Sequence, residues 1–352
     1  MSELAHHRIA FIDALRGFAL LLMVLNHTAT HLLTQTLDPG RHSLVYVTLS
    51  LSAPLFLFIV GFSLVLSFYR HRTVPLGNTQ AYYWKYLKRG LGLLLAGYTL
   101  NIVIAPHEPL YSGGILQTIG ISIILITPLL PKLQQEKFRD RLLFIAFLIY
   151  LLFVNAQPSI AVWSSRHPLM THLFFEGFPP WPWISMVLIG LYSGCRWVEV
   201  EDQTDSMMRR HLLQIQILGI VSLMIYFALN MMQGNILNFS IYRDYILNGH
   251  WVPSSITVFW IIGITLTVFA VMYRMFANRY RYLHWLIVLG QSAFILYVAH
   301  LLIIVSIADR LYSLRIHQWW LFIAFNIVLV MAMVVILSRF KLFTRQHRNA
   351  IP

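Results

Sequence analysis

The sequence predicts an all-α membrane protein, a polytopic bundle of about ten transmembrane helices with both termini in the cytoplasm. Of the 352 residues, 58% are hydrophobic and 11% are charged, whereas a soluble domain carries roughly 25% charged residues. The other two observations are a series of long apolar stretches and an uneven distribution of Lys and Arg between them. This composition excludes an ordinary soluble enzyme, a disordered protein and a nucleic-acid-binding protein.

A helix needs about 20 mostly apolar residues to cross the hydrocarbon core of a bilayer. The segments that fit this length are 9–31, 44–69, 90–105, 114–131, 142–158, 180–197, 212–232, 253–273, 284–307 and 318–338. The first lacks the small-residue cleavage site of a signal peptide, so we expect it to be a retained helix. Since the connecting segments are short, we expect one integral-membrane domain over residues 1–352.

The basic residues predict the orientation of these helices. The chain has 26 Lys and Arg against 13 Asp and Glu, a net charge of +13. Twenty of the basic residues fall on one set of alternate connecting segments and termini, and five fall on the opposite set. Cytoplasmic loops collect Lys and Arg, so both termini are predicted to be cytoplasmic. The excess of positive charge therefore indicates orientation, and we expect no nucleic-acid partner.

The first span contains ionisable residues, which are functional candidates because a charge at the bilayer centre costs about 2.5–3.5 kcal/mol. Asp13, Arg16 and His27 fall within an arc of about 60° on one face of the helix, at 100° per residue. His27 lies about 21 Å beyond Asp13 along the axis, in the outer half of the membrane. This stripe predicts a wet or protein-lined interior. The alternatives are an interfacial Asp13–Arg16 ion pair and a hydrogen-bonded core histidine.

The same helix offers a metal-binding alternative. His27 and His31 have the i,i+4 spacing of two metal ligands on one helix face. No nearby carboxylate completes such a site, so we expect no bound metal. The single cysteine, Cys195, excludes an intramolecular disulfide and a multi-cysteine metal site.

The ninth span carries Ser292, Tyr297 and His300. His300 lies about 24 Å from the inner end of this span, at a depth similar to that of His27. Two histidines from opposite ends of the chain could therefore line one cavity. Alternatively, each is buried separately with its own carbonyl acceptor.

Two further segments combine polar groups with helix starts. Lys85, Lys88 and Arg89 follow a run of aromatic residues directly before a span, where they could bind phosphates or serve only as a positive-inside stop. Residues 113–120 open the fourth span with three glycines and Gln117. They indicate either close helix packing or a polar cavity lining.

Together these motifs resemble a known group of enzymes. Residues 8–27, in which His27 follows Arg16 by eleven positions, resemble the first helix of the transmembrane acyltransferase superfamily. Residues 53–64 are similar to the next helix of that superfamily. Residues 114–120, Gly-Ile-Leu-Gln-Thr-Ile-Gly, resemble the heparan-α-glucosaminide N-acetyltransferase branch, and residues 289–300 resemble a C-terminal motif of the acyltransferase-three branch.

The resemblance implies an enzyme that moves an acyl group, expected to be acetyl, from cytoplasmic acyl-CoA to an extracytoplasmic hydroxyl or amine. Acyl-CoA would be a co-substrate, with no permanently bound cofactor. Lys85, Lys88 and Arg89 would hold the CoA phosphates, and Arg16 would assist near the entrance for the thioester. His27 would act as general base or carry the acyl group, which suits an imidazole near neutral pH.

The resemblance also adds residues around the reaction. Asp13 joins the histidine as a catalytic candidate, and the acceptor or cavity lining would include Gln117, Ser292, Tyr297 and His300. The acceptor is expected to be a glycan or lipid-linked sugar of a bacterial envelope, which implies the inner (plasma) membrane. Besides the lipid bilayer, the acyl-CoA and this acceptor, a homodimer is among the open oligomeric states.

The sequence departs from the heparan-type branch in one respect. There the catalytic histidine lies in the outer loop before the proline-containing helix, and the nearest equivalent is His42, twelve residues before Pro54. The acidic residue expected shortly before that proline is absent. The catalytic histidine is therefore His27 or His42, and His27 is favoured.

A transporter or flippase of a small amphipathic molecule is the alternative function, and an accessory membrane protein is the third class. Transporters often consist of repeated halves with paired broken helices, and the sequence contains no convincing internal repeat. A membrane acyltransferase is therefore the leading interpretation.

Overall fold

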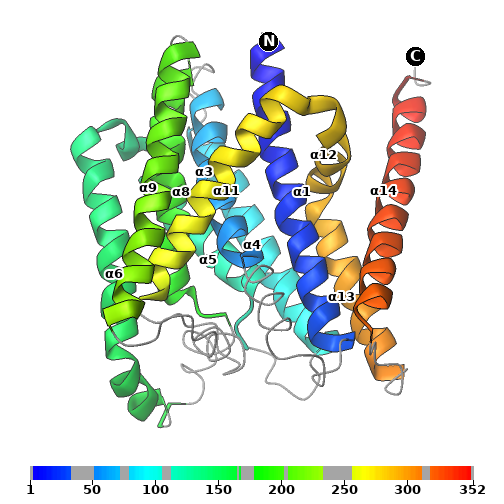
Figure 1. Ribbon diagram of the computed structural model, residues 1–352, viewed down its shortest axis with the longest axis horizontal. Coiled ribbons are helices and arrows are strands. Elements are labelled where there is room, and N and C mark those ends of the chain that lie inside the picture. Colours follow the sequence, from blue (N-terminus) through cyan, green and yellow to red (C-terminus); the bar gives the residue numbers. More distant parts are fainter. Residues whose placement is uncertain are drawn as a thin grey trace. The chain divides into compact units, whose positions relative to one another are not determined.

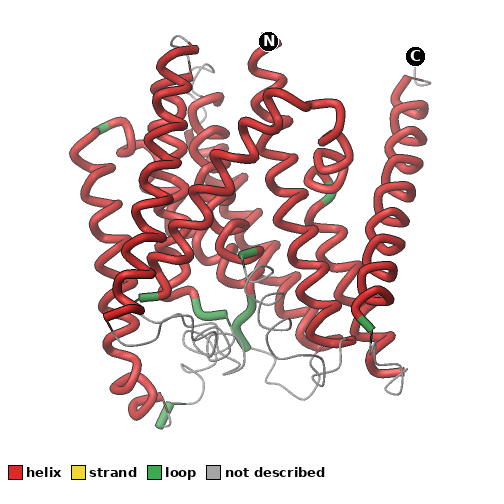
Figure 2. Tube along the Cα trace, in the orientation of Figure 1, coloured by secondary structure: helices red, strands yellow, loops and turns green. Residues whose placement is uncertain are grey.

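The computed structural model describes residues 3–32, 51–71, 79–104, 112–164, 166–167, 178–201, 205–232, 256–310 and 318–349. Within these ranges the chain is helical and has no strand (Figure 2). The predicted all-α fold class is therefore confirmed.

Seven helical segments in the described ranges are long and apolar enough to cross a membrane. They lie in α1 (Glu3–Leu32), α3 (Ser52–His71), α4 (Thr79–Ile104), α5 (Ile115–Ile126) with η2 (Thr127–Gln134), α9 (Asp205–Met232), α11 (Thr257–Arg279) and α14 (Trp319–Asn349). After η3 (Tyr280–Leu283), α12 (His284–Gln291) and α13 (Ala293–Arg310) meet at an 80° bend and form an eighth if the pair counts as one span. The chain is thus an integral membrane protein.

The remaining two predicted spans are occupied by α6 (Glu136–Ser164) and α8 (Pro180–Glu201). These helices are less apolar, because the first turns of α6 read Glu-Lys-Phe-Arg-Asp-Arg and α8 ends with Arg196, Glu199 and Glu201. The number of ten spans and the cytoplasmic location of both termini stay predictions.

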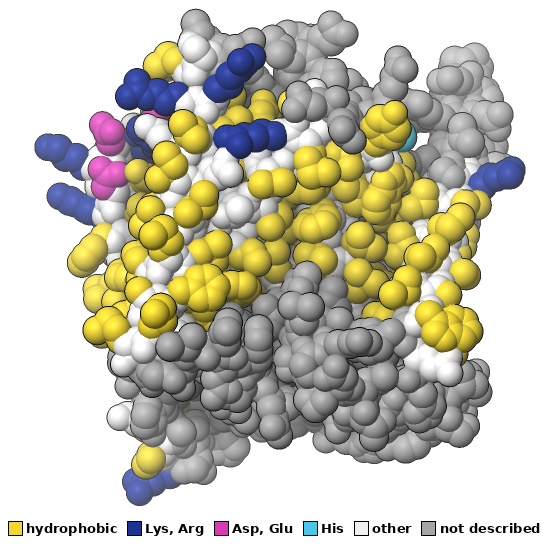
Figure 3. Space-filling view, in the orientation of Figure 1, with side chains coloured by type: hydrophobic (Ala, Val, Ile, Leu, Met, Phe, Trp, Pro, Cys, Tyr) yellow, Lys and Arg dark blue, Asp and Glu magenta, His cyan; other side chains and the backbone are white. Residues whose placement is uncertain are grey.

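Large hydrophobic side chains cover the outer faces of several helices. Leu95 on α4 is 71% exposed, Phe144 on α6 67%, Met224 on α9 65% and Val328 on α14 66%. Figure 3 shows such side chains in yellow along the helices. Soluble proteins seldom expose apolar surface on this scale, so these faces are suited to contact with lipid.

The chain forms two compact units: unit 1 contains residues 1–53 and 271–352, and unit 2 contains residues 54–270. In unit 1, α1 packs against α12 and α13 from the other end of the chain, as Figure 1 shows in blue, gold and orange. The expectation of one domain over residues 1–352 stays a prediction.

In unit 1, the backbones of α1 and α12 touch. A Cβ atom on Gly17 would lie 2.0 Å from the carbonyl oxygen of Leu286, and one on Gly290 would lie 1.7 Å from that of Asp13. Small residues permit this approach between membrane helices. Phe11 also packs edge-on against Tyr273 of α11, with ring centroids 5.0 Å apart. These contacts hold α1, which carries His27, against the C-terminal helices.

Unit 2 has an equivalent crossing between α3 and α8. A Cβ atom on Gly61 would lie 1.9 Å from the Val187 carbonyl oxygen, and one on Gly190 would lie 2.0 Å from that of Phe58. Aromatic rings fill the adjacent core, where Phe62 contacts Phe269 at a centroid distance of 5.3 Å. The α4–α5 and α6–α8 pairs pack within the same unit.

Candidate active site on the first helix

His27 of α1 and His300 of α13 form a hydrogen-bonded pair within unit 1. The Nδ1 atom of His27 lies 2.8 Å from Nε2 of His300, and the two rings are nearly parallel at 10°. His300 is fully buried, whereas His27 is partly exposed. The structure therefore brings together the two histidines that the sequence puts at similar depth.

The hydrogen-bond partners of the pair fix the positions of its protons. Nδ1 of His300 lies 2.7 Å from the carbonyl oxygen of Leu296, one turn earlier on α13. A carbonyl can only accept, so His300 donates its Nδ1–H there, and the Nε2 of a neutral His300 must accept. His27 then donates its Nδ1–H to His300. In a neutral His27, this arrangement leaves the lone pair on Nε2, where a general base needs it.

The bend between α12 and α13 sets the course of the helix that carries His300. Ser292 lies at this bend; its N–H donates to the carbonyl of Leu289 at 3.1 Å and its own carbonyl accepts from Leu296 N–H at 3.0 Å. One turn before His300, the ring of Tyr297 packs edge-on against the imidazole at a centroid distance of 5.6 Å. Ser292 and Tyr297 therefore shape the surroundings of His300.

Asp13 and Arg16 form an i,i+3 ion pair of 2.7 Å, with side chains 13% and 26% exposed. Along α1 they lie about 21 and 16 Å from His27, at 1.5 Å per residue. They are thus separate from the histidine pair, and a role for either residue in the chemistry stays a prediction.

Lys85, Lys88 and Arg89 lie exposed near the start of α4 in unit 2. At 100° per residue, Lys88 shares a face of the helix with Trp84 and with Leu95, which are 54% and 71% exposed. This face continues the exposed apolar surface of α4. Exposed Lys and Arg side chains can bind phosphate groups, so both the CoA-binding and the positive-inside interpretations stay open.

Gln117 is buried between α4 and α5 in unit 2. Its side-chain amide lies where a Cβ atom on Gly97 would approach it to 2.6 Å, and its Nε2 donates to the carbonyl of Ser112 at 3.4 Å. Asn101 donates to the same carbonyl at 2.8 Å. The close-packing interpretation thus has direct contacts here, while a role in acceptor binding stays a prediction. His42 lies outside the described residues.

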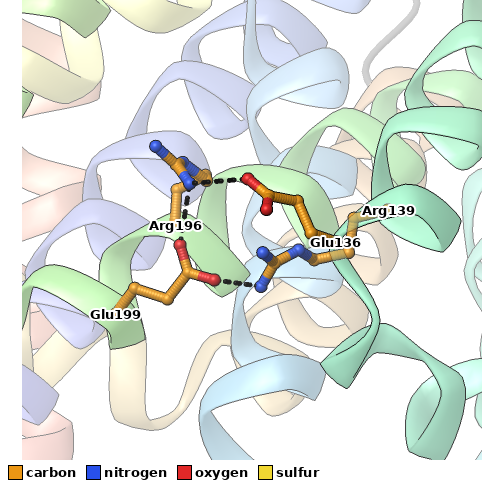
Figure 4. Close-up of polar contacts among 4 residues, drawn as sticks. All are labelled: Glu136, Arg139, Arg196 and Glu199. Atoms are coloured by element: carbon orange, nitrogen blue, oxygen red, sulfur yellow. Dashed lines mark hydrogen bonds and ion pairs between the residues drawn. The ribbon is translucent and has the colours of Figure 1, made fainter.

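Sequence reasoning missed an ionic network that joins α6 to α8 in unit 2, labelled in Figure 4. Arg139 pairs with Glu199, and Arg196 lies 2.9 Å from Glu199 and 3.9 Å from Glu136. Burial lowers the pKa of Arg139, but the hydrogen bond and charge of Glu199 outweigh this effect and raise the pKa above its usual value. The sequence signal for this pairing was the presence of Glu136 and Glu199 within the basic segments at the start of α6 and the end of α8.

A second missed contact lies beside His27. The next residue, Thr28, places its hydroxyl oxygen 2.8 Å from Oδ1 of Asn326 on α14. Both residues are buried, with exposed fractions of 0% and 3%. A single asparagine in an apolar helix has no spacing pattern that predicts its partner.

The chain matches the family described as heparan-alpha-glucosaminide N-acetyltransferase, catalytic, over residues 8–231, well over half of its length. A comparison with curated proteins found no match. The matched stretch contains His27 and the basic residues of α4, whereas His300 and Asn326 lie beyond it.

Proposed function

We propose a donor, an acceptor and a catalytic base from one premise: the chain belongs to the heparan-alpha-glucosaminide N-acetyltransferase catalytic family and is thus a membrane acetyltransferase. The donor is cytoplasmic acetyl-CoA, which the family uses in general. The acceptor is a hydroxyl or amine of an extracytoplasmic glycan or lipid-linked sugar, and the membrane is the bacterial inner membrane. His27 is the base.

The hydrogen-bond chain from His27 through His300 to Leu296 carries this proposal. Nε2 of His27 takes the proton of the acceptor hydroxyl or amine as its oxygen or nitrogen attacks the thioester carbonyl. The bond between the carbonyl carbon and sulfur breaks, and the CoA thiolate leaves. Transfer of the proton from His27 to this thiolate gives CoA and the acetylated acceptor, so the base is regenerated.

His300 supports the charged intermediate state of this base. When His27 becomes an imidazolium, its Nδ1–H still points at the lone pair of His300 Nε2, and a hydrogen bond from a charged donor is about twice as strong as a neutral one. His300 can accept because its own proton is held by Leu296. Tyr297 lies on the same helix as His300, and Ser292 lies at the bend just before that helix; both are proposed to line the acceptor site. His42 and Asp13 are the alternative catalytic groups.

The donor side of the proposal rests on charge. Lys85, Lys88 and Arg89 offer exposed cations for the phosphates of CoA. Arg16, which lies about 16 Å from His27 along α1, would help to bind the acyl-CoA at the entrance for the thioester, and Gln117 would line the acceptor path. CoA is a co-substrate in this scheme and leaves after each turnover.

The test is release of CoA from acetyl-CoA by purified protein in lipid nanodiscs, with glucosamine as an acceptor that offers both hydroxyls and an amine. We expect His27→Gln to slow release at least about 100-fold, the usual contribution of a positioned base, with binding of acetyl-CoA retained. His211→Gln is the matched control, because His211 is also a partly buried helical histidine but lies in unit 2. Wild-type rates in His27→Gln would overturn the assignment and turn attention to His42.

A further inference from the structure

We propose that Asn326 on α14 is a positioning residue for His27 and acts through Thr28; this inference rests on the proposed function of His27 as the base. Thr28 follows His27 directly on α1, and its side chain contacts a different helix from the one that His27 contacts. Neither Thr28 nor Asn326 touches the reacting groups in the proposed chemistry.

The orientation of the Asn326 amide follows from its second partner. Nδ2 of Asn326 donates to the carbonyl of Phe322 at 2.9 Å, one turn earlier on α14. Since that carbonyl can only accept, Oδ1 must be the atom that faces Thr28, and the hydroxyl must donate. The carbonyls of Val24 and Leu25 lie 3.0 and 2.9 Å from the same hydroxyl. Asn326 thus competes with the backbone of α1 for this one proton.

His27 and Thr28 therefore make the same kind of hydrogen bond to two neighbouring helices. Each donates to a side chain on another helix, His300 on α13 or Asn326 on α14. Each acceptor in turn donates to the carbonyl four residues earlier in its own helix. An acceptor held in this way cannot turn its donor toward α1, so both contacts have a fixed direction.

The contact of His27 with α13 and the contact of Thr28 with α14 together fix the rotation of α1 about its axis, which one contact alone would leave free. Consecutive residues point about 100° apart around a helix, so the contact with Asn326 restrains rotation of α1 about its axis. That rotation would change the direction of the His27 ring and the length of its bond to His300. Asn326 thereby holds Nε2 of His27 toward the position where an acceptor must bind.

The experiment measures the reactivity of His27 without any acyl donor, so its outcome is independent of whether the protein turns over acetyl-CoA. Diethyl pyrocarbonate modifies unprotonated imidazole, and tandem mass spectrometry that distinguishes His27 from the nearby His31 gives the rate constant of His27 at about pH 5 to 8. The variants are Asn326→Leu, Thr28→Val, their combination, and Thr28→Ser, which keeps the hydroxyl.

We expect Asn326→Leu and Thr28→Val each to change the rate constant of His27 at least about threefold and to shift its pH profile, within the range of coupled residues. The combined variant should show no further change, and Thr28→Ser should behave like wild type. The control is Asn230→Leu on α9: Asn230 is also a buried membrane asparagine whose Nδ2 donates to the carbonyl four residues earlier, Tyr226, at 2.9 Å. It should leave His27 unaffected.

A wild-type rate and pH profile in folded Asn326→Leu would overturn the proposal. If that variant does not fold, the isosteric Thr28→Val decides, and wild-type reactivity there has the same meaning. If the Asn326 and Thr28 variants change the reactivity of His27 but the wild type releases no CoA, the positioning role stands and the acetyl-transfer function of His27 is refuted. If the wild type releases CoA but these variants leave the reactivity of His27 unchanged, the positioning role is refuted and the acetyl-transfer function stands.

Discussion

Two of the polar clusters in the described part of the chain, one in each unit, accommodate polar groups among apolar helices in different ways. In the cluster of His27, His300 and Leu296, the described hydrogen bonds join neutral groups: Nδ1 of His27 lies 2.8 Å from Nε2 of His300, and Nδ1 of His300 lies 2.7 Å from the Leu296 carbonyl oxygen. The network of Glu136, Arg139, Arg196 and Glu199 consists of charges shared between neighbours. The first can therefore offer a basic nitrogen, whereas in the second the charges mainly neutralise one another.

The surroundings of the clusters fit this division. His300 is fully buried in unit 1, where a charge would be costly and a neutral imidazole is favoured. In the ionic network, the side chains of Arg196 and Glu136 are 43% and 72% exposed, and only Arg139 is deeply buried. The neutral cluster is therefore the one suited to proton transfer, whereas the charged cluster joins α6 to α8.

The largest expected effect comes from separating α1 from the helices that form the histidine cluster. Gly290→Ala places a methyl group where a backbone oxygen lies 1.7 Å away, so α1 and α12 must move apart. Overpacking of this kind costs about 1–3 kcal/mol or more, and we expect a large loss of folded protein by fluorescence-detected size-exclusion chromatography. Gly92→Ala is the control, because nothing lies within 4 Å of a Cβ atom there. Equal folded yields for both variants would contradict the described crossing.

The next largest effect concerns the catalytic role of the histidine cluster rather than its folding. His300→Leu removes the acceptor for His27 Nδ1–H, and we expect CoA release to fall at least about tenfold because the histidine loses the partner that orients it. Binding of acetyl-CoA should stay unchanged. Tyr297→Phe keeps the ring beside His300 and should retain the rate within about twofold. A rate in His300→Leu equal to that of wild type would mean that His300 does not orient the base.

The smallest effects concern the ionic network and should appear in stability alone. Arg139→Gln removes the buried guanidinium group that pairs with Glu199, and we expect a loss of about 1–3 kcal/mol in the free energy of unfolding. Arg196→Gln removes a charge on a side chain that is 43% exposed and should cost less than about 1 kcal/mol. Both are measured by reversible denaturation in mixed micelles. If either variant slowed CoA release per folded molecule, the contrast between the two clusters would break down.

The helical bundle could be predicted from the sequence because apolar segments long enough to cross a membrane have few alternatives to a helix. It also put His27 and His300 at similar depth, since depth follows from residue number along a helix. It did not predict the bend at Ser292, which interrupts one continuous apolar run without a proline. The Thr28–Asn326 and Arg139–Glu199 contacts were missed because periodicity within one helix does not specify its neighbours.

The most direct test of the central claim is nuclear magnetic resonance of the protein labelled with [15N]histidine in lipid bilayers, with His27→Gln used to assign the His27 signals. We expect a neutral His27 ring that carries its proton on Nδ1, hydrogen-bonded to Nε2 of His300. We also expect a His300 that carries its proton on Nδ1. A His27 ring with its proton on Nε2 would contradict the claim, because that nitrogen could not then act as the base.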